Sequence, residues 1–184
     1  MSTEATAAPL ISGYAEALLS VATAEDCLER VENELFHFAR ALEANAQLRD
    51  RLVDPAVETS AKLGVVTDLL GARAHPQTVA AVTWVVQAGR SRQLPMIADE
   101  LVRQAARSRH RAVAEVRAAV PLSEEQRDRI ARALQGSTNE PVDVKVVVDP
   151  EVIGGLVVRM GDTVIDGTVA KRLSDLRSLM MSGA

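Results

Sequence analysis

The stretch VDVKVVVDPEVIGGLVVRMGDTVIDGTVAKRLSDL, residues 142–176, changes its hydrophobic period along its length. Valines at alternate positions of residues 142–148 share one face of an extended chain, because strand side chains alternate with period two. Asp149 and Pro150 end that strand, since proline supplies no N–H to a β-ladder. Two further β-branched runs follow the glycine pair at 154–155, and such a pair favours a bulge or a close backbone approach. Three short strands are therefore predicted.

The period changes after residue 167. Apolar residues then recur at the three- and four-residue spacing of one helical face. They are Val169, Leu173, Leu176, Leu179 and Met180. A closing amphipathic helix is predicted to follow the strands.

This stretch resembles the delta subunit family of bacterial F-type ATP synthases, whose mitochondrial relative is the oligomycin-sensitivity-conferring protein. The pattern V-x-V-x-x-x-V-D-x-x-V-x-G-G-L-x-V-R-x-G at residues 142–161 fits the family signature at each specified position. Three other segments resemble family motifs in the expected order. They are Tyr14-Ala15-x-Ala17-Leu18, Gly89-Arg90 with Leu94-Pro95-x-Ile97, and Pro121-Leu122-Ser123-x-x-Gln126.

Composition indicates a globular protein built largely of helices. The chain has 184 residues, 47% of them apolar but only 2% aromatic, so alanine, valine and leucine must form the core. A net charge of −4 gives no overall electrostatic reason to bind nucleic acid or an anionic membrane. A single cysteine excludes an internal disulfide bond. No apolar run reaches the roughly 20 residues that span a bilayer, so any membrane link is expected through a partner.

Two of the expected helices are apolar nearly all round. In the first, residues 9–22, the only polar stripe is Ser12, Glu16 and Ser20. In the fifth, residues 78–89, it is Thr83 and Gln87. A helix packed on one core needs an apolar stripe only somewhat wider than about 100°. Each helix therefore either lies at the centre of a bundle or offers its second face to a partner, and the pattern alone leaves both open.

The predicted fold class is mainly α, with an N-terminal six-helix bundle followed by a small α+β C-terminal domain. Residues 1–8 are expected to be disordered, residues 9–108 to form the bundle, and residues 109–184 to form two helices on a four-stranded sheet. Ser123 and Gln126 have the spacing of a capping box, which places a helix start between the first two strands. The resemblance implies the same two-domain organisation.

No catalytic or metal-binding constellation is predicted. His37, His75 and His110 are far apart and none has a second ligand at metal spacing. Asp149, Asp162 and Asp166 stand beside proline or glycine, where aspartate is a common turn residue. We expect no enzyme activity in this chain and no cofactor.

A basic segment supports a different hypothesis. Residues 90–117, from Arg90 to Arg117, hold seven arginines against three acids. A nucleic-acid-binding adaptor using this segment is the alternative function, although the segment lacks the aromatic residues that stack on bases. Cations near the negative end of a helix are the simpler explanation.

The resemblance implies two partner sites. In the family, helices one and five form a groove for the N-terminal helix of an F1 alpha subunit. The matching residues here are Ile11, Tyr14, Ala15, Leu18, Val79, Val82 and Val86. Trp84 belongs either to that groove or to the core. The C-terminal domain is expected to meet the C-termini of the b (or b and b′) subunits. The residues expected there are Leu173, Leu176, Leu179 and Met180.

The function implied by the resemblance is that of a non-catalytic stator subunit. Such a subunit links the top of the F1 alpha/beta hexamer to the b subunits of the peripheral stalk, so that rotor torque drives ATP synthesis. The N-terminus has no signal peptide or presequence pattern. The expected location is the cytoplasmic face of the cell membrane, as a peripheral part of the complex.

Overall fold

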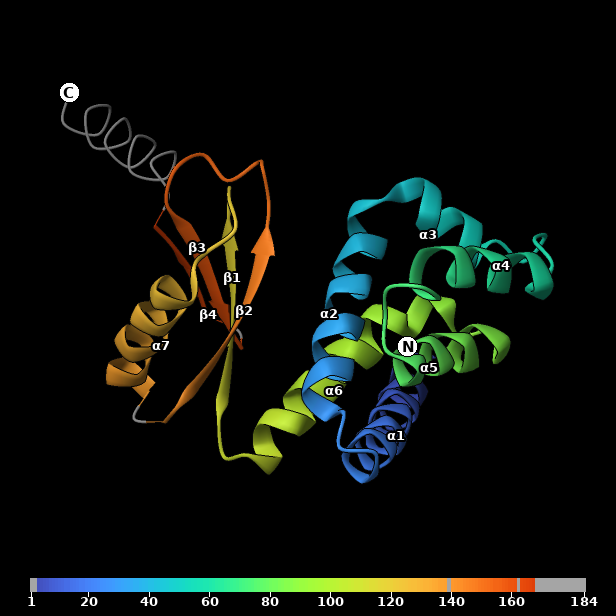
Figure 1. The fold of residues 1–184 in the computed structure, drawn as a ribbon, viewed down its shortest axis with the longest axis horizontal. Helices are drawn as coiled ribbons and strands as arrows, with labels where there is room; N and C mark the ends of the chain where they lie inside the picture. Colours follow the sequence, from blue (N-terminus) through green and yellow to red (C-terminus); the bar gives the residue numbers. More distant parts are fainter. Residues whose placement is uncertain (1–2, 139, 162, 168–184) are drawn as a thin grey trace. The chain divides into compact units, whose positions relative to one another are not determined.

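The computed structural model describes residues 3–138, 140–161 and 163–167, and it divides the chain into two compact units (Figure 1). The boundary lies between Ala105 and Ala106, near the end of helix α6. The first unit is helical, and the second combines one described helix with a sheet. The two units are described separately below.

Six α-helices and one 3₁₀ turn build the first unit and lead into the second. They are α1 (Thr3–Ala24), α2 (Leu28–Ala44), α3 (Ala46–Val53), α4 (Thr59–Leu70), α5 (Pro76–Gln87), η1 (Ser91–Gln93) and α6 (Leu94–Ser108). The prediction of six helices in this part of the chain is confirmed.

Helix α1 begins earlier than the sequence analysis predicts. Residues 3–8, expected to be disordered, are helical, and Pro9 lies inside the helix rather than in its first turn. Alanines at positions 5, 7 and 8 are strong helix formers, and proline at position 9 removes only one backbone hydrogen bond, close to the helix start. The expectation of disorder there is wrong for the described residues 3–8.

The starts of α2 and α5 are set by local backbone geometry. Asp26 has φ of +51°, a left-handed conformation that no α-helix continues through, and Cys27 is the N-cap of α2. Helix α5 begins two residues earlier than predicted, with His75 as N-cap and Pro76 in the first turn. It ends at Gln87, and Gly89 follows with φ of +69°, a conformation that favours glycine, while the Arg90 N–H bonds to the Val85 carbonyl at 3.0 Å.

The core of the helical unit is aliphatic. Buried side chains from α1, α2, α5 and α6 form one cluster, joined by Leu52 of α3 and Val66 of α4. Leu35, Ile97 and Leu101 are at most 1% exposed. Small and branched side chains fill most of this core, as the composition predicts, and Phe38 adds one aromatic ring to the cluster.

The second unit carries a four-stranded sheet in the order β2-β1-β3-β4. Its elements are β1 (Ala112–Ala118), α7 (Glu124–Thr138), β2 (Val142–Val148), β3 (Leu156–Met160) and β4 (Thr163–Asp166). β1 and β2 are parallel, and the other two pairs are antiparallel. The predicted capping box begins α7: the Ser123 N–H donates to Gln126 Oε1 at 2.8 Å, and the Gln126 N–H donates to Ser123 Oγ at 3.3 Å.

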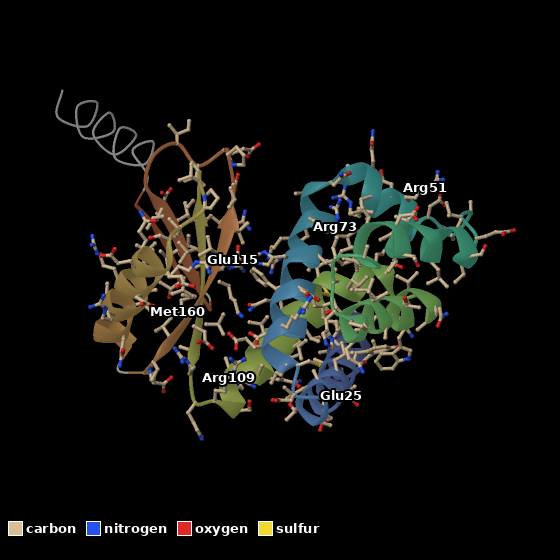
Figure 2. All side chains as sticks on the ribbon, in the orientation of Figure 1. Glu25, Arg51, Arg73, Arg109, Glu115 and Met160 are labelled. Carbon is tan, nitrogen blue, oxygen red and sulfur yellow. The ribbon has the colours of Figure 1, made fainter. Side chains whose placement is uncertain are left out.

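The two faces of this sheet differ in chemistry. Helix α7 covers the face that carries Ala114 and Val142, and Leu134 packs against both. Met160 lies on this covered side, whereas Glu115 belongs to the opposite, charged face (Figure 2). The valines at 142 and 146 are buried and share one face, as period two requires.

The fold class is confirmed: the chain is mainly helical, with a small four-stranded sheet after the helical unit. Gly154 and Gly155 both have positive φ, +61° and +102°, so the glycine pair makes the turn that leads into β3. The predicted closing helix and Asp162 lie outside the described residues.

Candidate partner-binding groove

An apolar groove runs between α1 and α5 of the helical unit. Its volume is about 280 Å³, and Gln77 is the one residue of its lining that is neither aliphatic nor aromatic. The lining residues are Ala17, Leu18, Val21, Ala22, Val31, Gln77, Ala80, Ala81 and Trp84. Helices α1 and α5 form the walls, and Val31 of α2 lies between them at one end.

The groove is open to solvent because its largest side chains are incompletely covered. Val21 is 50% exposed and Trp84 is 44% exposed. The Tyr14 ring packs on the Trp84 indole, with 4.5 Å between ring centroids and an interplanar angle of 37°. Exposed apolar side chains that line a concavity mark interaction sites more often than isolated ones do.

Helical periodicity explains why both walls are apolar. Positions 14, 17, 18 and 21 follow one another on one side of α1, and positions 77, 80, 81 and 84 do so on α5. Each helix also presents a second apolar side to the core, through Ala15 in α1 and through Val82 and Val85 in α5. The two apolar sides that the sequence shows on each of these helices are therefore a side that packs in the core and a side that lines the groove.

The predicted groove residues fall into three groups. Ala15, Val82 and Val86 are at most 2% exposed and belong to the core cluster, so a partner cannot reach them in this conformation. Leu18 is 8% exposed and lines the groove. The half-buried predicted residues are Ile11, Tyr14 and Val79.

Several groove residues are absent from the sequence prediction. Ala17, Val21 and Ala80 are exposed and line the walls, and Trp84 lies in the groove rather than in the core. The signal that identifies them is the second apolar stripe of each helix. The predicted set mixes the two stripes, because periodicity shows that two faces exist without showing which one meets the bundle. The predicted b-subunit residues, Leu173, Leu176, Leu179 and Met180, lie outside the described residues.

A carboxylate joins α2 to the start of α5, next to the groove. Glu34 Oε2 accepts hydrogen bonds from the His75 N–H at 2.7 Å and from Thr78 Oγ1 at 2.6 Å, and Glu34 Oε1 accepts one from Arg30 Nε at 2.8 Å. Burial raises the pKa of Glu34, but the three hydrogen bonds and the charge of Arg30 outweigh it, so this pKa lies below its usual value.

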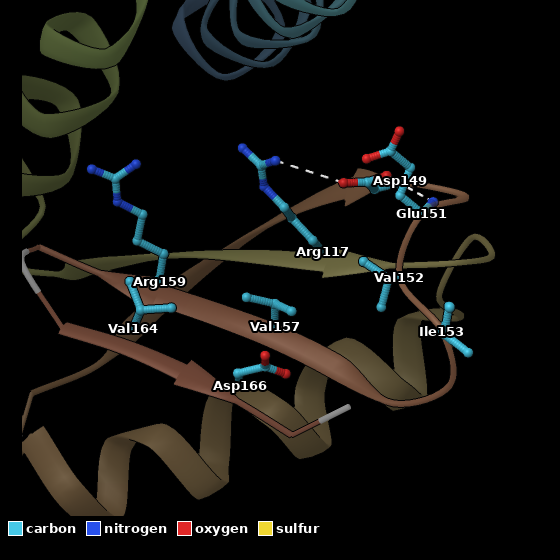
Figure 3. A pocket seen from close by; sticks show the side chains of 9 residues that line it. All are labelled: Arg117, Asp149, Glu151, Val152, Ile153, Val157, Arg159, Val164 and Asp166. Atoms are coloured by element: carbon cyan, nitrogen blue, oxygen red, sulfur yellow. Dashed lines mark hydrogen bonds and ion pairs between the residues drawn. The ribbon is translucent and has the colours of Figure 1, made fainter. Parts of the chain in front are cut away.

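A second, larger cavity of about 450 Å³ lies on the open face of the sheet (Figure 3). Arg117 of β1 and Arg159 of β3 rise from it, and Val157 and Val164 form its floor. Arg117 is paired with Glu115 at 2.9 Å and with Asp149 at 3.6 Å. This cavity is lined by ion pairs and valines, and the described residues bring no histidine into it.

The basic segment is extensively paired with carboxylates. Arg103 contacts Glu100, and Arg111 Nε lies 2.8 Å from Asp143 Oδ1. Arg109 also approaches Asp143, at 3.8 Å. Each of these arginines has a carboxylate partner within the chain, which does not support the nucleic-acid alternative, because that alternative needs cations available to phosphates.

The described residues contain neither a candidate metal site nor a candidate membrane-spanning helix. Over residues 3–138, 140–161 and 163–167, no group of three or more His, Cys, Asp or Glu side chains is arranged to hold a metal ion. Within the same residues, no helix has the length and apolar character needed to cross a bilayer.

The fold and the groove define a class of protein: a helical unit with an apolar groove, followed in the chain by a small unit of one described helix and a four-stranded sheet. The family model of the ATP synthase delta (OSCP) subunit matches residues 11–180. The chain therefore belongs to the ATP synthase delta (OSCP) subunit family, and the resemblance found in the sequence is confirmed.

Individual relatives agree with this assignment. The chain is 43% identical over 162 residues to "ATP synthase subunit delta" of Parafrankia sp., covering 88% of this chain and 58% of the relative. The protein of the same name from Streptomyces lividans is 41% identical over 157 residues, with 85% and 58% covered. The Nocardia farcinica protein is 43% identical over 162 residues, with 88% and 60% covered. The chain thus spans about three fifths of the length of these relatives.

A solved structure shares the fold over most of the chain. A chain in the cryo-EM structure of the Toxoplasma gondii mitochondrial ATP synthase hexamer superposes with a TM-score of 0.57 at 33% identity. The match covers 94% of this chain and 97% of that one.

Proposed function

We propose that this chain is a non-catalytic stator subunit in the peripheral stalk of an F-type, proton-translocating ATP synthase. In this role it links the top of the F1 alpha/beta hexamer to the b subunits and resists the torque of the central rotor. Family membership over residues 11–180 supports the assignment. A static link under load needs slow dissociation, and two binding units on one chain supply it through effective concentration.

The observation that carries the proposal is the apolar groove between α1 and α5. Its occupant is the amphipathic N-terminal helix of an F1 alpha subunit, whose apolar side chains replace water over Val21 and Trp84. Full burial of an exposed aliphatic side chain contributes about 1.5–3 kcal/mol, and Val21 is already half buried, so completing its burial contributes about half of that. Leu18 lies at the base of the groove, and Ile11, Tyr14 and Val79 are its half-buried neighbours in the proposed contact.

The second partner site is assigned to the C-terminal part of the chain. We place the contact with the C-termini of the b subunits at Leu173, Leu176, Leu179 and Met180, whose spacing forms one apolar helical face. Membrane association then arises only through the complex, on the cytoplasmic face of the cell membrane.

Calorimetric titration into F1 that lacks this subunit tests the assignment. We expect one-to-one binding that persists at high salt, because apolar burial is not screened by ions. Transfer RNA serves as the control titrant. Salt-sensitive binding to the RNA, with no heat from F1, would replace the stator assignment by the nucleic-acid alternative.

A pair of matched variants tests the groove itself. Ala80→Asp places a carboxylate on the groove wall, and we expect F1 affinity to fall at least about tenfold, because that charge is desolvated without a partner. Ala41→Asp makes the same change at an exposed helical position of α2 that does not line the groove, and its affinity should equal that of the parent. Equal affinity for Ala80→Asp and Ala41→Asp would exclude the groove as the F1 contact.

A further inference from the structure

The start of α5 is held by a side chain from another helix. Glu34 of α2 accepts from the backbone N–H of His75 and from the hydroxyl of Thr78, across 41 and 44 residues of sequence. His75 is the N-cap residue of α5, and its own Nδ1 accepts from the Gln77 N–H at 3.3 Å. One carboxylate thus ties two groups at the start of α5 to the middle of α2.

The tie is electrostatically well placed. The first N–H groups of a helix have no intrahelical partner and carry the positive end of its dipole, so a carboxylate there is stabilised. The Thr78 side chain is fully buried, and a hydroxyl that is buried without a partner costs free energy. Without Glu34, the His75 N–H and the Thr78 hydroxyl lose their acceptor, and a shift of α5 that finds new acceptors for them becomes favourable.

The tie also lies at one end of the groove. Val31, three residues before Glu34 on α2, is part of the groove lining. On α5, Gln77 directly precedes Thr78 and Ala81 lies three residues after it, and both line the same groove. Any rotation or axial shift of α5 therefore moves the groove wall relative to α1.

We propose that Glu34 is a positioning residue for the groove: by holding the start of α5 against α2, it sets the spacing of the α5 wall from α1. This inference rests on the proposed function for the identity of the occupant. The geometry it describes belongs to the free protein and can be measured there.

Trp84 supplies a direct readout, because it is the only tryptophan of the chain and it lies on the wall that Glu34 positions. Its fluorescence emission and its quenching by acrylamide report the environment of the groove. A contribution of Glu34 to overall stability alone, without any effect on the position of α5, leaves both quantities unchanged in the folded protein.

The experiment compares four variants with the parent, at a temperature where each is fully folded by circular dichroism. Glu34→Ala removes the acceptor. Glu34→Gln keeps one carbonyl oxygen that can accept from both His75 and Thr78, and so acts as the conservative rescue. Thr78→Val removes one donor with little change in shape. Glu29→Gln changes an exposed acid one turn or more away on the same helix and serves as control.

We expect Glu34→Ala to shift Trp84 emission and to change its quenching constant, with a smaller change in Thr78→Val and none in Glu34→Gln or Glu29→Gln. F1 affinity should fall roughly tenfold in Glu34→Ala and remain near that of the parent in Glu34→Gln. Unchanged emission and quenching in both Glu34→Ala and Thr78→Val would overturn the positioning role. If Glu34→Ala does not fold, Thr78→Val decides the same question.

F1 binding and Trp84 fluorescence test the stator assignment and the positioning role of Glu34 separately. If the parent does not bind F1, the stator assignment fails, while the fluorescence of free Glu34→Ala still decides whether Glu34 positions α5. If the parent binds F1 but Glu34→Ala shows parental fluorescence, only the positioning role is excluded.

Discussion

The ring of Tyr14 on α1 packs on the indole of Trp84 on α5, with 4.5 Å between their centroids. The contact joins the two walls of the apolar groove in a chain with very few aromatic residues. Residue 14 lies near the middle of α1 and residue 84 lies in the last turn of α5, so the contact joins the middle of one wall to the end of the other.

Removal of this ring contact should loosen the groove. Tyr14→Ala forfeits the aromatic pair, worth about 0.5–1.5 kcal/mol beyond area burial, together with the packing of a half-buried ring. We expect a loss of about 2 kcal/mol in the free energy of unfolding and a red shift of Trp84 emission, measured by urea titration followed by fluorescence. Tyr14→Phe should retain both properties. A parental emission maximum in Tyr14→Ala would show that the stacking does not shield the indole.

Aspartate should lower the folding stability at one alanine of α1 and lower F1 binding at another. Ala15 is fully buried in the core, whereas Ala17 is exposed on the groove wall. Ala15→Asp buries a charge without a partner and should cost more than about 3 kcal/mol or prevent folding. Ala17→Asp should cost under about 1 kcal/mol and reduce F1 binding instead.

Thermal melts followed by circular dichroism separate these two outcomes. A stable Ala15→Asp protein that has lost F1 binding would mean that Ala15 faces the partner, as the sequence prediction has it, and that α1 is rotated from its position in this structure.

How far the sequence predicts the fold depends on the kind of signal each element carries. The capping box at Ser123 is a local signal, since one backbone geometry satisfies it, and it is confirmed. The glycine pair at 154–155 is also a local signal, but it makes a turn before β3 where the sequence analysis predicts a bulge or a close backbone approach. The face that a helix buries is not a local property. α1 and α5 are apolar on both sides, so only the packing of the other helices decides that Val82 is core and Ala80 is groove.

The tie made by Glu34 is the clearest case of information that the sequence does not show. Glu34 reads as one more acid on the polar side of an amphipathic helix, and its partners lie 41 and 44 residues away. Nothing in the spacing of Glu34, His75 and Thr78 distinguishes them from solvent-facing residues before the helices are packed. Only the folded structure shows that Glu34 caps the start of α5.

Protonation of Glu34 at low pH should weaken its contact with the start of α5. The pKa of Glu34 in the folded protein lies below that of the unfolded chain, because hydrogen bonds from Arg30, Thr78 and the His75 amide outweigh its burial. The folded state therefore binds the proton less readily than the unfolded state does. The stabilisation from ionised Glu34 is fully present above the unfolded pKa, near 4.5, and is lost as pH falls through the lower folded value.

Urea midpoints measured between pH 7 and pH 3 test whether folding lowers the pKa of Glu34. The stability difference between the parent and Glu34→Gln should be greatest at neutral pH and should shrink below about pH 4.5. Glu29→Gln controls for the general effect of removing one acid from α2. A difference that grows as the pH falls would mean that the folded-state pKa of Glu34 is raised rather than lowered.

The end of α6 carries a residue whose conformation costs free energy. His110 has φ of +53° and occupies the left-handed position after the helix, where the Arg111 N–H bonds to the Ala106 carbonyl at 2.9 Å and the His110 N–H bonds to the Arg107 carbonyl at 3.0 Å. This pair of hydrogen bonds is the Schellman arrangement, in which glycine is favoured because it has no Cβ. His110→Gly should therefore stabilise the chain by about 0.5–1 kcal/mol, seen as a higher urea midpoint, while His110→Ala should give no gain. Destabilisation by His110→Gly would mean that the imidazole makes a contribution larger than the backbone strain it imposes.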